Sequence, residues 1–215
     1  MAVNSMAKTD PFDKHSDKYD KWFEVHADLY ALELAAIREL LPESLGKSLE
    51  VGVGSGKFAH PLGITTGVEP SIPMAKKAIE LGIDVRIGTA EELPFVDNEF
   101  DLVLMVTTIC FVDDLDAAFG EAMRVLKPGR CIILGFVDKE SELGRKYRQR
   151  QQESIFYREA TFFSTEEVLK HLEIAGFVDH RIRQTLCPDD PSDTIRDGYG
   201  TGSFLAIKSF KPVQS

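Results

Sequence analysis

Cysteine is scarce in this 215-residue sequence, and its three residues show no regular spacing. Cys110, Cys131 and Cys187 have no arrangement that suits a metal ion, and no disulfide framework is expected from them. Chains that need neither are typical of a reducing compartment. We therefore expect a cytoplasmic protein that holds no metal ion.

Long apolar runs and a basic excess are also missing. No run of roughly 18 apolar residues occurs, so no membrane span is expected, and residues 1–10 lack the apolar centre of a signal peptide. Lys and Arg total 25 against 35 Asp and Glu, which gives a formal net charge of −10. Because nucleic-acid binding depends on neutralising phosphates, this charge argues against a nucleic-acid partner.

The overall composition is that of an ordinary globular protein, with 43% hydrophobic and 28% charged residues. A length of 215 residues suits one domain with a sizeable core, so a single domain over 1–215 is expected. Within it we distinguish an N-terminal helical cap (1–44), a core (45–137), an insertion (138–163) and a closing helix with strands (164–215). No sequence feature indicates an oligomeric state.

An N-terminal helical segment precedes alternating strands and helices. Residues 1–14 look loosely ordered, and residues 16–41 read as a helix with a break near His26. The apolar face of this helix consists of Leu29, Leu32, Ala36, Ile37 and Leu40. Strands are expected at 48–52, 64–69, 84–87, 100–106, 130–137, 178–186 and 202–210, and further helices near 55–60, 72–81, 114–126 and 164–176. This order predicts an α/β fold, with a doubly wound, mostly parallel seven-stranded sheet whose last strand is antiparallel.

A strand that runs into alternating glycines lies at residues 49–59, LEVGVGSGKFA. Glycine has no Cβ and tolerates positive φ, so this loop allows the backbone to approach a ligand closely; an ordinary tight turn is the alternative. A phosphate loop would need a glycine at Val51 and a hydroxyl at Phe58, and a dinucleotide fingerprint would need a small residue at Lys57. The spacing that fits is an acid followed by alternating glycines, namely Glu50, Gly52, Gly54 and Gly56.

Three further motifs follow in order. Glu69 and Pro70 end the second expected strand, where an acid can accept hydrogen bonds from two hydroxyl groups. The segment GTAEELPF at 88–95 follows the third strand, and LKPG at 126–129 ends a helix before the fifth. Taken singly, each has an ordinary structural explanation, such as a solvated acid, a proline at a helix start or a loop with exposed acids.

Together, the motifs over roughly residues 45–137 resemble those of class I S-adenosylmethionine-dependent methyltransferases. They look most like the branch that includes the ubiquinone- and menaquinone-biosynthesis enzymes, and the flanking motif YDKW at 19–22 also occurs there. The resemblance implies a Rossmann-like methyltransferase fold, with S-adenosylmethionine as cofactor and S-adenosylhomocysteine as its product. Many members carry histidines where this sequence has Thr107 and Thr108, so the resemblance extends to the cofactor and not to a quinone substrate.

The resemblance also implies where the cofactor binds. Glu69 would accept from both ribose hydroxyls, and Pro70 would lie against the adenine. Glu91 and the backbone of Ala90 would read the edge of the adenine ring. The implied cofactor-binding residues are Glu50, Gly52, Gly54, Gly56, Glu69, Pro70, Ala90, Glu91 and Val106.

The insertion at 138–163 is expected on the substrate side. It holds a basic cluster and several aromatic residues, so one interpretation is a lid that meets an anionic acceptor. An exposed helix with solvated charges is the other interpretation. The candidate substrate residues are Tyr19, Trp22, Thr107, Thr108, Cys110, Arg145 and Arg148. No residue is singled out as a catalytic base.

We therefore expect an enzyme that transfers a methyl group from S-adenosylmethionine to a small-molecule acceptor by in-line displacement. The sequence lacks the Asn/Asp-Pro-Pro-Tyr/Phe motif of enzymes that methylate nucleobases or glutamine, which disfavours those acceptors. A non-catalytic S-adenosylmethionine-binding module is one alternative, because cofactor binding and methyl transfer use different residues. An NAD-dependent oxidoreductase is another, and Lys57 argues against it.

Overall fold

The computed structural model describes residues 8–188 and 194–213, and an eight-stranded sheet is its central layer. The strands are β1 (Ser48–Val51), β2 (Thr66–Val68), β3 (Asp84–Arg86), β4 (Phe100–Val106), β5 (Leu126–Val137), β6 (Val178–Thr185), β7 (Arg196–Asp197) and β8 (Phe204–Phe210). Their order in the sheet is β3-β2-β1-β4-β5-β8-β6-β7. The strands β1 to β5 are parallel, whereas β8 runs antiparallel to both β5 and β6.

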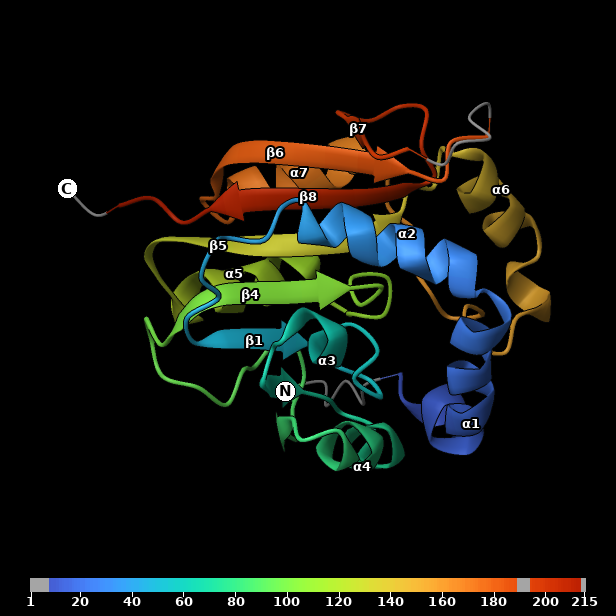
Figure 1. Ribbon diagram of the computed structural model, residues 1–215, viewed down its shortest axis with the longest axis horizontal. Helices are drawn as coiled ribbons and strands as arrows, with labels where there is room; N and C mark the ends of the chain where they lie inside the picture. The colour runs from blue at the N-terminus through green and yellow to red at the C-terminus, as the bar shows by residue number, and fades with distance from the viewer. Residues whose placement is uncertain (1–7, 189–193, 214–215) are drawn as a thin grey trace, which may run out of the picture.

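Helices cover both faces of this sheet (Figure 1). They are α1 (Asp10–Val25), α2 (Ala27–Arg38), α3 (Ala59–Leu62), α4 (Ile72–Glu80), α5 (Leu115–Val125), α6 (Glu142–Gln149), the 3₁₀ helix η1 (Gln151–Glu153) and α7 (Thr165–Ile174). The helices α2, α3 and α4 lie on one face, and α5 and α7 lie on the other. The predicted doubly wound fold, with its last strand antiparallel, is confirmed.

The sheet has one strand more than the seven predicted. This strand, β7, is two residues long and pairs with Arg183 and Gln184 at the edge of the sheet. A strand this short has no alternation of apolar and polar residues, so the sequence pattern does not reveal it.

The N-terminal segment becomes helical earlier than the sequence suggests. Helix α1 begins at Asp10, inside the stretch 1–14 that is expected to be loosely ordered; residues 1–7 lie outside the described part of the chain. Pro11 in its first turn favours this start, because the missing N–H would have no helical partner there. The predicted break near His26 is confirmed, since it separates α1 from α2.

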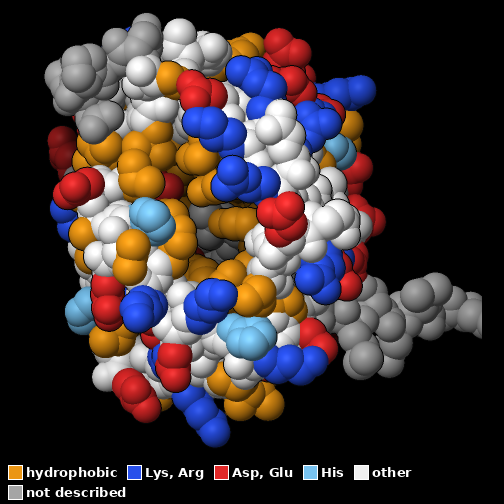
Figure 2. All heavy atoms as spheres, turned by 90° about the vertical axis from the view of Figure 1, so that its right-hand side faces the viewer, with side chains coloured by type: hydrophobic (Ala, Val, Ile, Leu, Met, Phe, Trp, Pro, Cys, Tyr) orange, Lys and Arg blue, Asp and Glu red, His pale blue; other side chains and the backbone are white. Residues whose placement is uncertain are grey.

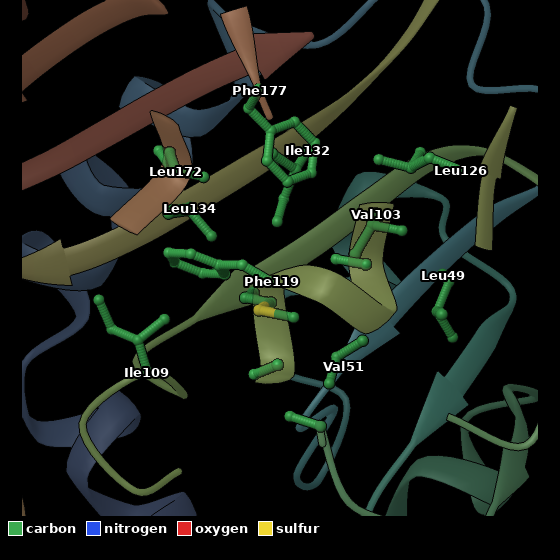
Figure 3. Packing of buried hydrophobic residues seen from close by; sticks show 14 of the residues in the cluster. Leu49, Val51, Val103, Ile109, Phe119, Leu126, Ile132, Leu134, Leu172 and Phe177 are labelled. Atoms are coloured by element: carbon green, nitrogen blue, oxygen red, sulfur yellow. The ribbon is translucent and has the colours of Figure 1, made fainter. Parts of the chain in front are cut away.

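A large apolar cluster fills the space between the sheet and α5 (Figure 3). Helix α5 presents its apolar residues at helical spacing, and Phe119 among them is fully buried. Strand β4 is buried at all but one of its positions, as a strand covered on both faces requires. Leu172 and Phe177 extend the cluster under α7. The sheet is thereby a rigid support for the loops at its ends.

The carboxyl ends of β1 and β4 lie side by side. Both strands point toward the side of the molecule where α1 and α6 lie (Figure 1). From β1 the sheet continues through β2 in one direction, and from β4 it continues through β5 in the other. Such a switch point is where open α/β sheets bind ligands.

Candidate functional site

A cavity of about 1140 Å³ opens at this end of the sheet. Its walls come from α1, α2, the glycine loop, the loops after β2, β3 and β4, and the 138–163 insertion. Figure 2 looks onto this side and shows a hollow with hydrophobic walls and several Lys and Arg side chains around its mouth. Ligand pockets commonly measure roughly 300–1,000 Å³, so this one has room for more than one small molecule.

The glycine loop borders this cavity with left-handed backbone. The φ angle is +70° at Gly52, +55° at Gly54 and +83° at Gly56. A Cβ on Gly52 would lie 2.5 Å from Thr108 Cγ2, so only glycine allows the loop to close against the end of β4. A Cβ on Gly54 would extend toward Tyr19 Oη, 3.8 Å away in the cavity wall. Gly54 therefore keeps space for a ligand next to the backbone.

Glu69 follows β2 and lines the cavity beside this loop. It is 7% exposed, and the N–H groups of Gly54 and Ser71 donate to its two oxygens at 2.9 Å each. Burial raises the pKa of Glu69 to about 7, although these hydrogen bonds act to lower it. Each oxygen has a further lone pair, so the carboxylate can accept from two neighbouring hydroxyl groups of a ligand.

Glu50 lies beneath the loop and does not line the cavity. It is 1% exposed, and its Oε2 has no hydrogen-bond partner among the described residues. Burial raises the pKa of Glu50 well above its ordinary value, despite a hydrogen bond from the backbone of Ala59. An unpartnered carboxylate oxygen at this depth is costly, so the protonated form is favoured.

The other predicted cofactor residues meet around Glu69. The cavity is lined by Pro70, Ala90, Glu91 and Val106. Glu91 Oε1 accepts from the N–H of Asp113 at 2.8 Å, which ties the loop after β3 to the loop after β4. Gly56 belongs to the loop without lining the cavity.

Four of the candidate substrate residues line the cavity, namely Tyr19, Trp22, Thr107 and Thr108. Burial raises the pKa of the Tyr19 hydroxyl, and the side chain of Thr107 acts in the opposite direction. Thr107 has a φ of +52°, a region that a β-branched side chain disfavours. Backbone strain of this kind, of order 1–3 kcal/mol, is concentrated at functional sites.

Arg145 and Arg148 are not brought to the cavity. Both are exposed; Arg145 donates to the carbonyl of Glu140, and Arg148 Nη1 lies 3.8 Å from Glu140 Oε1. The reason is the rotation of α6, which turns a different set of side chains inward. The cavity is lined by Leu143, Lys146 and Tyr147 of α6 and by Arg150 directly after it.

Cys110 borders a separate small cavity of about 20 Å³. Its thiol lies 3.4 Å from the carbonyl oxygen of Thr107, and burial raises its pKa to about 12. A thiol that stays protonated is a poor nucleophile. Cys110 therefore packs behind the wall that Thr107 forms.

Glu33 is not among the residues predicted from the sequence, although α2 places it in the cavity wall. The signal was present, because Glu33 lies three and four residues before Ala36 and Ile37 and shares their buried face. Phe12 and Phe111 were also missed. Their rings lie 5.1 Å apart, between centroids, and come from segments that only the fold brings together.

Comparison with known proteins reveals the family. Residues 49–134 match the family model of the methyltransferase domain. A SAM-dependent methyltransferase of Thermotoga maritima, described as a possible histamine N-methyltransferase, is 47% identical in sequence. The match covers 94% of this chain and 98% of that chain, with a TM-score of 0.89. An uncharacterized protein of Methanocaldococcus jannaschii is 41% identical over 203 residues, covering 93% of this chain and 98% of that protein.

A more distant relative agrees with these matches. A demethylmenaquinone methyltransferase of Roseiflexus sp. (strain RS-1) is 34% identical over 101 residues, which is 42% of this chain and 42% of that protein. The fold, the glycine loop and these matches define a methyltransferase that uses S-adenosylmethionine. The chain belongs to the class I S-adenosylmethionine-dependent methyltransferases, so it is an enzyme, and the oxidoreductase and the non-catalytic module are set aside.

The structure can be searched for metal-binding side-chain groups and for membrane-spanning helices. Residues 8–188 and 194–213 contain no group of His, Cys, Asp and Glu side chains that could hold a metal ion. Within these same ranges, no helix is both long enough and apolar enough to cross a membrane.

Proposed function

We propose that the enzyme transfers the methyl group of S-adenosylmethionine to a small-molecule acceptor bound in the same cavity. The observation that carries this proposal is the continuity of the cavity, which extends from Glu69 to the aromatic residues Tyr147 and Tyr157. One end suits the cofactor, and the other is walled by the 138–163 insertion. A walled compartment of this kind favours a small molecule over a segment of a polymer.

At the cofactor end, Glu69 would accept from the ribose hydroxyls and Gly54 would leave space for the ligand. Pro70 and Glu91 would flank the adenine. The residues present fit this ligand, because a carboxylate oriented by two N–H groups borders a loop whose open space a Cβ would fill. When bound, the cofactor supplies a methyl group that its sulfonium has already activated.

In-line displacement depends on alignment of the acceptor and exclusion of water. The aromatic residues serve both purposes. The rings of Tyr147 and Tyr157 stack with centroids 5.4 Å apart, and Phe111 stacks on Tyr157 at 5.9 Å. Aromatic faces also attract a positive charge, which suits a sulfonium nearby.

The insertion is anchored at both ends, which supports its proposed role as a cover. At one end, Asp138 Oδ2 accepts from the N–H of Thr165 at 2.8 Å. At the other, the N–H of Thr161 donates to the carbonyl of Cys110 at 2.8 Å. Fixed ends hold the aromatic residues between them in position against the cavity.

An amine is the acceptor that these observations favour, in place of the anion suggested by the basic cluster. Arg145 and Arg148 contact Glu140 and do not line the cavity, and Lys146, which does line it, pairs with Glu142. The buried acid Glu33, in contrast, lines the cavity without an ion-pair partner among the described residues. The relative in Thermotoga maritima is described as a possible histamine N-methyltransferase, and histamine is a small amine.

The first experiment is a calorimetric titration of the cofactor-free protein with S-adenosylmethionine, S-adenosylhomocysteine and NAD in parallel. We expect saturable binding of both adenosyl ligands and none of NAD. Transfer from methyl-labelled S-adenosylmethionine is then screened with small amines and small carboxylates. Binding of the adenosyl ligands without transfer to any small molecule would contradict the proposed acceptor, and binding of NAD alone would contradict the proposed cofactor residues.

A further inference from the structure

Glu33 is an acid without a partner in the cavity wall. It lies on α2, is 5% exposed and lines the cavity. No hydrogen bond or ion pair joins its carboxyl group to any residue that the structure describes, and burial is the cause of its pKa shift. Buried carboxyl groups are normally paired, so an unpaired one at a cavity indicates that a ligand supplies the partner.

The titratable groups that face Glu33 are phenols. Tyr30 on α2, Tyr147 on α6 and Tyr157 after η1 each interact with its charge. None of these groups is a cation at neutral pH, and burial raises the pKa of Glu33 to about 8. A cation that enters the cavity would therefore stabilise the ionised form of Glu33.

The basic residues of the cavity lining do not neutralise Glu33. They are Lys8, Lys18, Lys146 and Arg150. Lys146 Nζ pairs instead with Glu142 Oε1 at 2.6 Å, and none of the four contributes to the pKa shift of Glu33. The acid therefore remains available to a ligand.

Aromatic rings complete the surroundings of this acid. Tyr147 and Tyr157 stack at an interplanar angle of 20°, and both line the cavity with Glu33. Carboxylates and aromatic faces both attract cations, and aromatic faces do so most strongly where water is excluded. This combination suits an organic ammonium group and disfavours a carboxylate or a phosphate.

We propose that Glu33, with the stacked rings of Tyr147 and Tyr157, forms a subsite for a positively charged nitrogen of the acceptor molecule. An ammonium nitrogen has no lone pair, so the methyl group goes to a different, uncharged atom of the same molecule. The inference rests on the proposed function, because it specifies the substrate class of the same cavity. Glu33 is then the residue that selects amines: its carboxylate pairs with the ammonium group and repels anions of the same size. Because this acid is mostly protonated at pH 7 when the subsite is empty, a bound ammonium group displaces its proton.

Matched probes test this subsite on the protein saturated with S-adenosylhomocysteine. They are the cation 2-phenylethylamine, the neutral 2-phenylethanol and the anion 3-phenylpropanoate. In calorimetry, the amine is expected to bind at least about tenfold more tightly than either analogue. At pH 7 its binding should release about one proton, obtained from the heats in two buffers of different ionisation enthalpy. The amine affinity should rise from pH 6 and level off above pH 8.

A variant of Glu33 tests whether the proton released on amine binding comes from this residue. Glu33→Gln keeps the side-chain shape, so the amine affinity should fall about tenfold or more and the proton release should disappear, while S-adenosylhomocysteine still binds. Asp28→Asn removes an exposed acid on the same helix and should change neither quantity. A purely structural role for Glu33 would not move the proton count.

Several outcomes would overturn this inference. They are failure of the amine to bind the loaded protein, equal or tighter binding of either analogue, and proton release that persists in Glu33→Gln. Failure of the wild-type protein to bind S-adenosylhomocysteine would instead overturn the proposed function. If Glu33→Gln does not fold, the relative affinities of the three probes and the proton release of the wild-type protein test the inference.

Discussion

Thr107 directly follows β4 and has an unfavourable backbone φ angle. It lies between the two ends of the cavity. In Thr107→Gly, the left-handed φ of +52° no longer strains the chain, so the free energy of unfolding should rise by about 1 kcal/mol. Methyl transfer should fall, because the cavity lining beside Tyr19 loses the Thr107 side chain. Chemical denaturation and initial rates measure the two effects.

Asp179→Gly is the matched control for this substitution. Asp179 has a φ of +54°, is exposed and lies outside the cavity lining. This variant should leave the rate of methyl transfer unchanged. A loss of stability in Thr107→Gly would mean that the side-chain contacts of Thr107 outweigh its backbone strain.

Glu69 is the residue on which cofactor affinity should depend most. Glu69→Ala should weaken S-adenosylmethionine binding by roughly 2–5 kcal/mol, since charge-assisted hydrogen bonds to the ribose are lost in a buried setting. Because burial raises the pKa of Glu69 to about 7, wild-type affinity should also fall as the pH drops below 7. Calorimetry measures both, with the exposed Asp84→Ala on β3 as control. If the affinity of Glu69→Ala for S-adenosylmethionine were unchanged, Glu69 would not bind the ribose.

The residues that line the cavity beside the glycine loop could be predicted, because their positions depend on backbone geometry. Gly52 and Gly54 need left-handed φ, and Glu69 ends a strand, so spacing along the chain locates all three. The spacing of Glu33 from Ala36 and Ile37 places it on their buried face, but spacing does not show what its carboxyl group contacts. An acid on a helix looks solvated in a sequence, and only the packed structure reveals that its partner is missing.

At the scale of elements, α1 is tied to the cofactor end of the cavity through Asp20. Its carboxylate accepts from Ser55 Oγ at 2.6 Å and from Lys77 Nζ at 2.7 Å, and Lys57 Nζ lies 3.4 Å away. Burial acts to raise the pKa of Asp20, but these hydrogen bonds outweigh it and lower the pKa. The network joins α1 to the glycine loop and to α4.

Asp20→Asn should weaken the attachment of α1 to the glycine loop and to α4. The release of S-adenosylhomocysteine should then become several-fold faster, because α1 forms part of the cavity wall at the end where this ligand is proposed to bind. Stopped-flow displacement measures the rate. Asp17→Asn is the control, since Asp17 pairs with the same Lys77 but its side chain is 96% exposed, so a small effect is expected. Equal release rates in wild type and Asp20→Asn would mean that α1 does not hold the ligand.

Elements with strong local signals were predicted well. The capping box of Ser164 and Glu167 begins α7 as expected, because both halves of that motif are local hydrogen bonds. The rotation of α6 was not predictable, because its inward face combines a leucine and a tyrosine with the stem of a lysine. Which side of such a helix is buried depends on the partners that the fold supplies.

At the scale of the whole molecule, three buried acids determine how stability depends on pH. Glu33, Glu50 and Glu69 all have a folded-state pKa above the ordinary 4.5. Between pH 4.5 and 8 the folded protein therefore keeps protons that the unfolded chain releases. Their contribution to stability is full below about pH 4.5 and is lost as the pH rises through 7 and 8.

The melting temperature of the cofactor-free protein should therefore fall between pH 5 and pH 9. Differential scanning calorimetry across this range measures the slope. Glu33→Gln should flatten the slope, because the group that titrates near pH 8 is gone, whereas Asp28→Asn should run parallel to wild type. A wild-type melting temperature that rises across this range would contradict the assignment of these acids as protonated.

The two ends of the cavity differ in how much of them could be predicted. The cofactor end comes from consecutive strand ends of a fold that alternating strands and helices already indicate. The acceptor end combines the N-terminal helices α1 and α2 with the 138–163 insertion, which lies far from them in the chain. No periodic pattern links such segments, so their side chains meet only once long-range packing is known.

The position of β8 has a consequence for the order in which the protein is made. This strand follows β6 along the chain yet lies between β5 and β6 in the sheet. Among the described strands, β6 pairs only with β8 and β7, so nothing connects it to β5 until residues 204–210 have been added. On the ribosome, the parallel half of the sheet with its glycine loop can assemble first. The part of the cavity beside the glycine loop can therefore form before the sheet is complete.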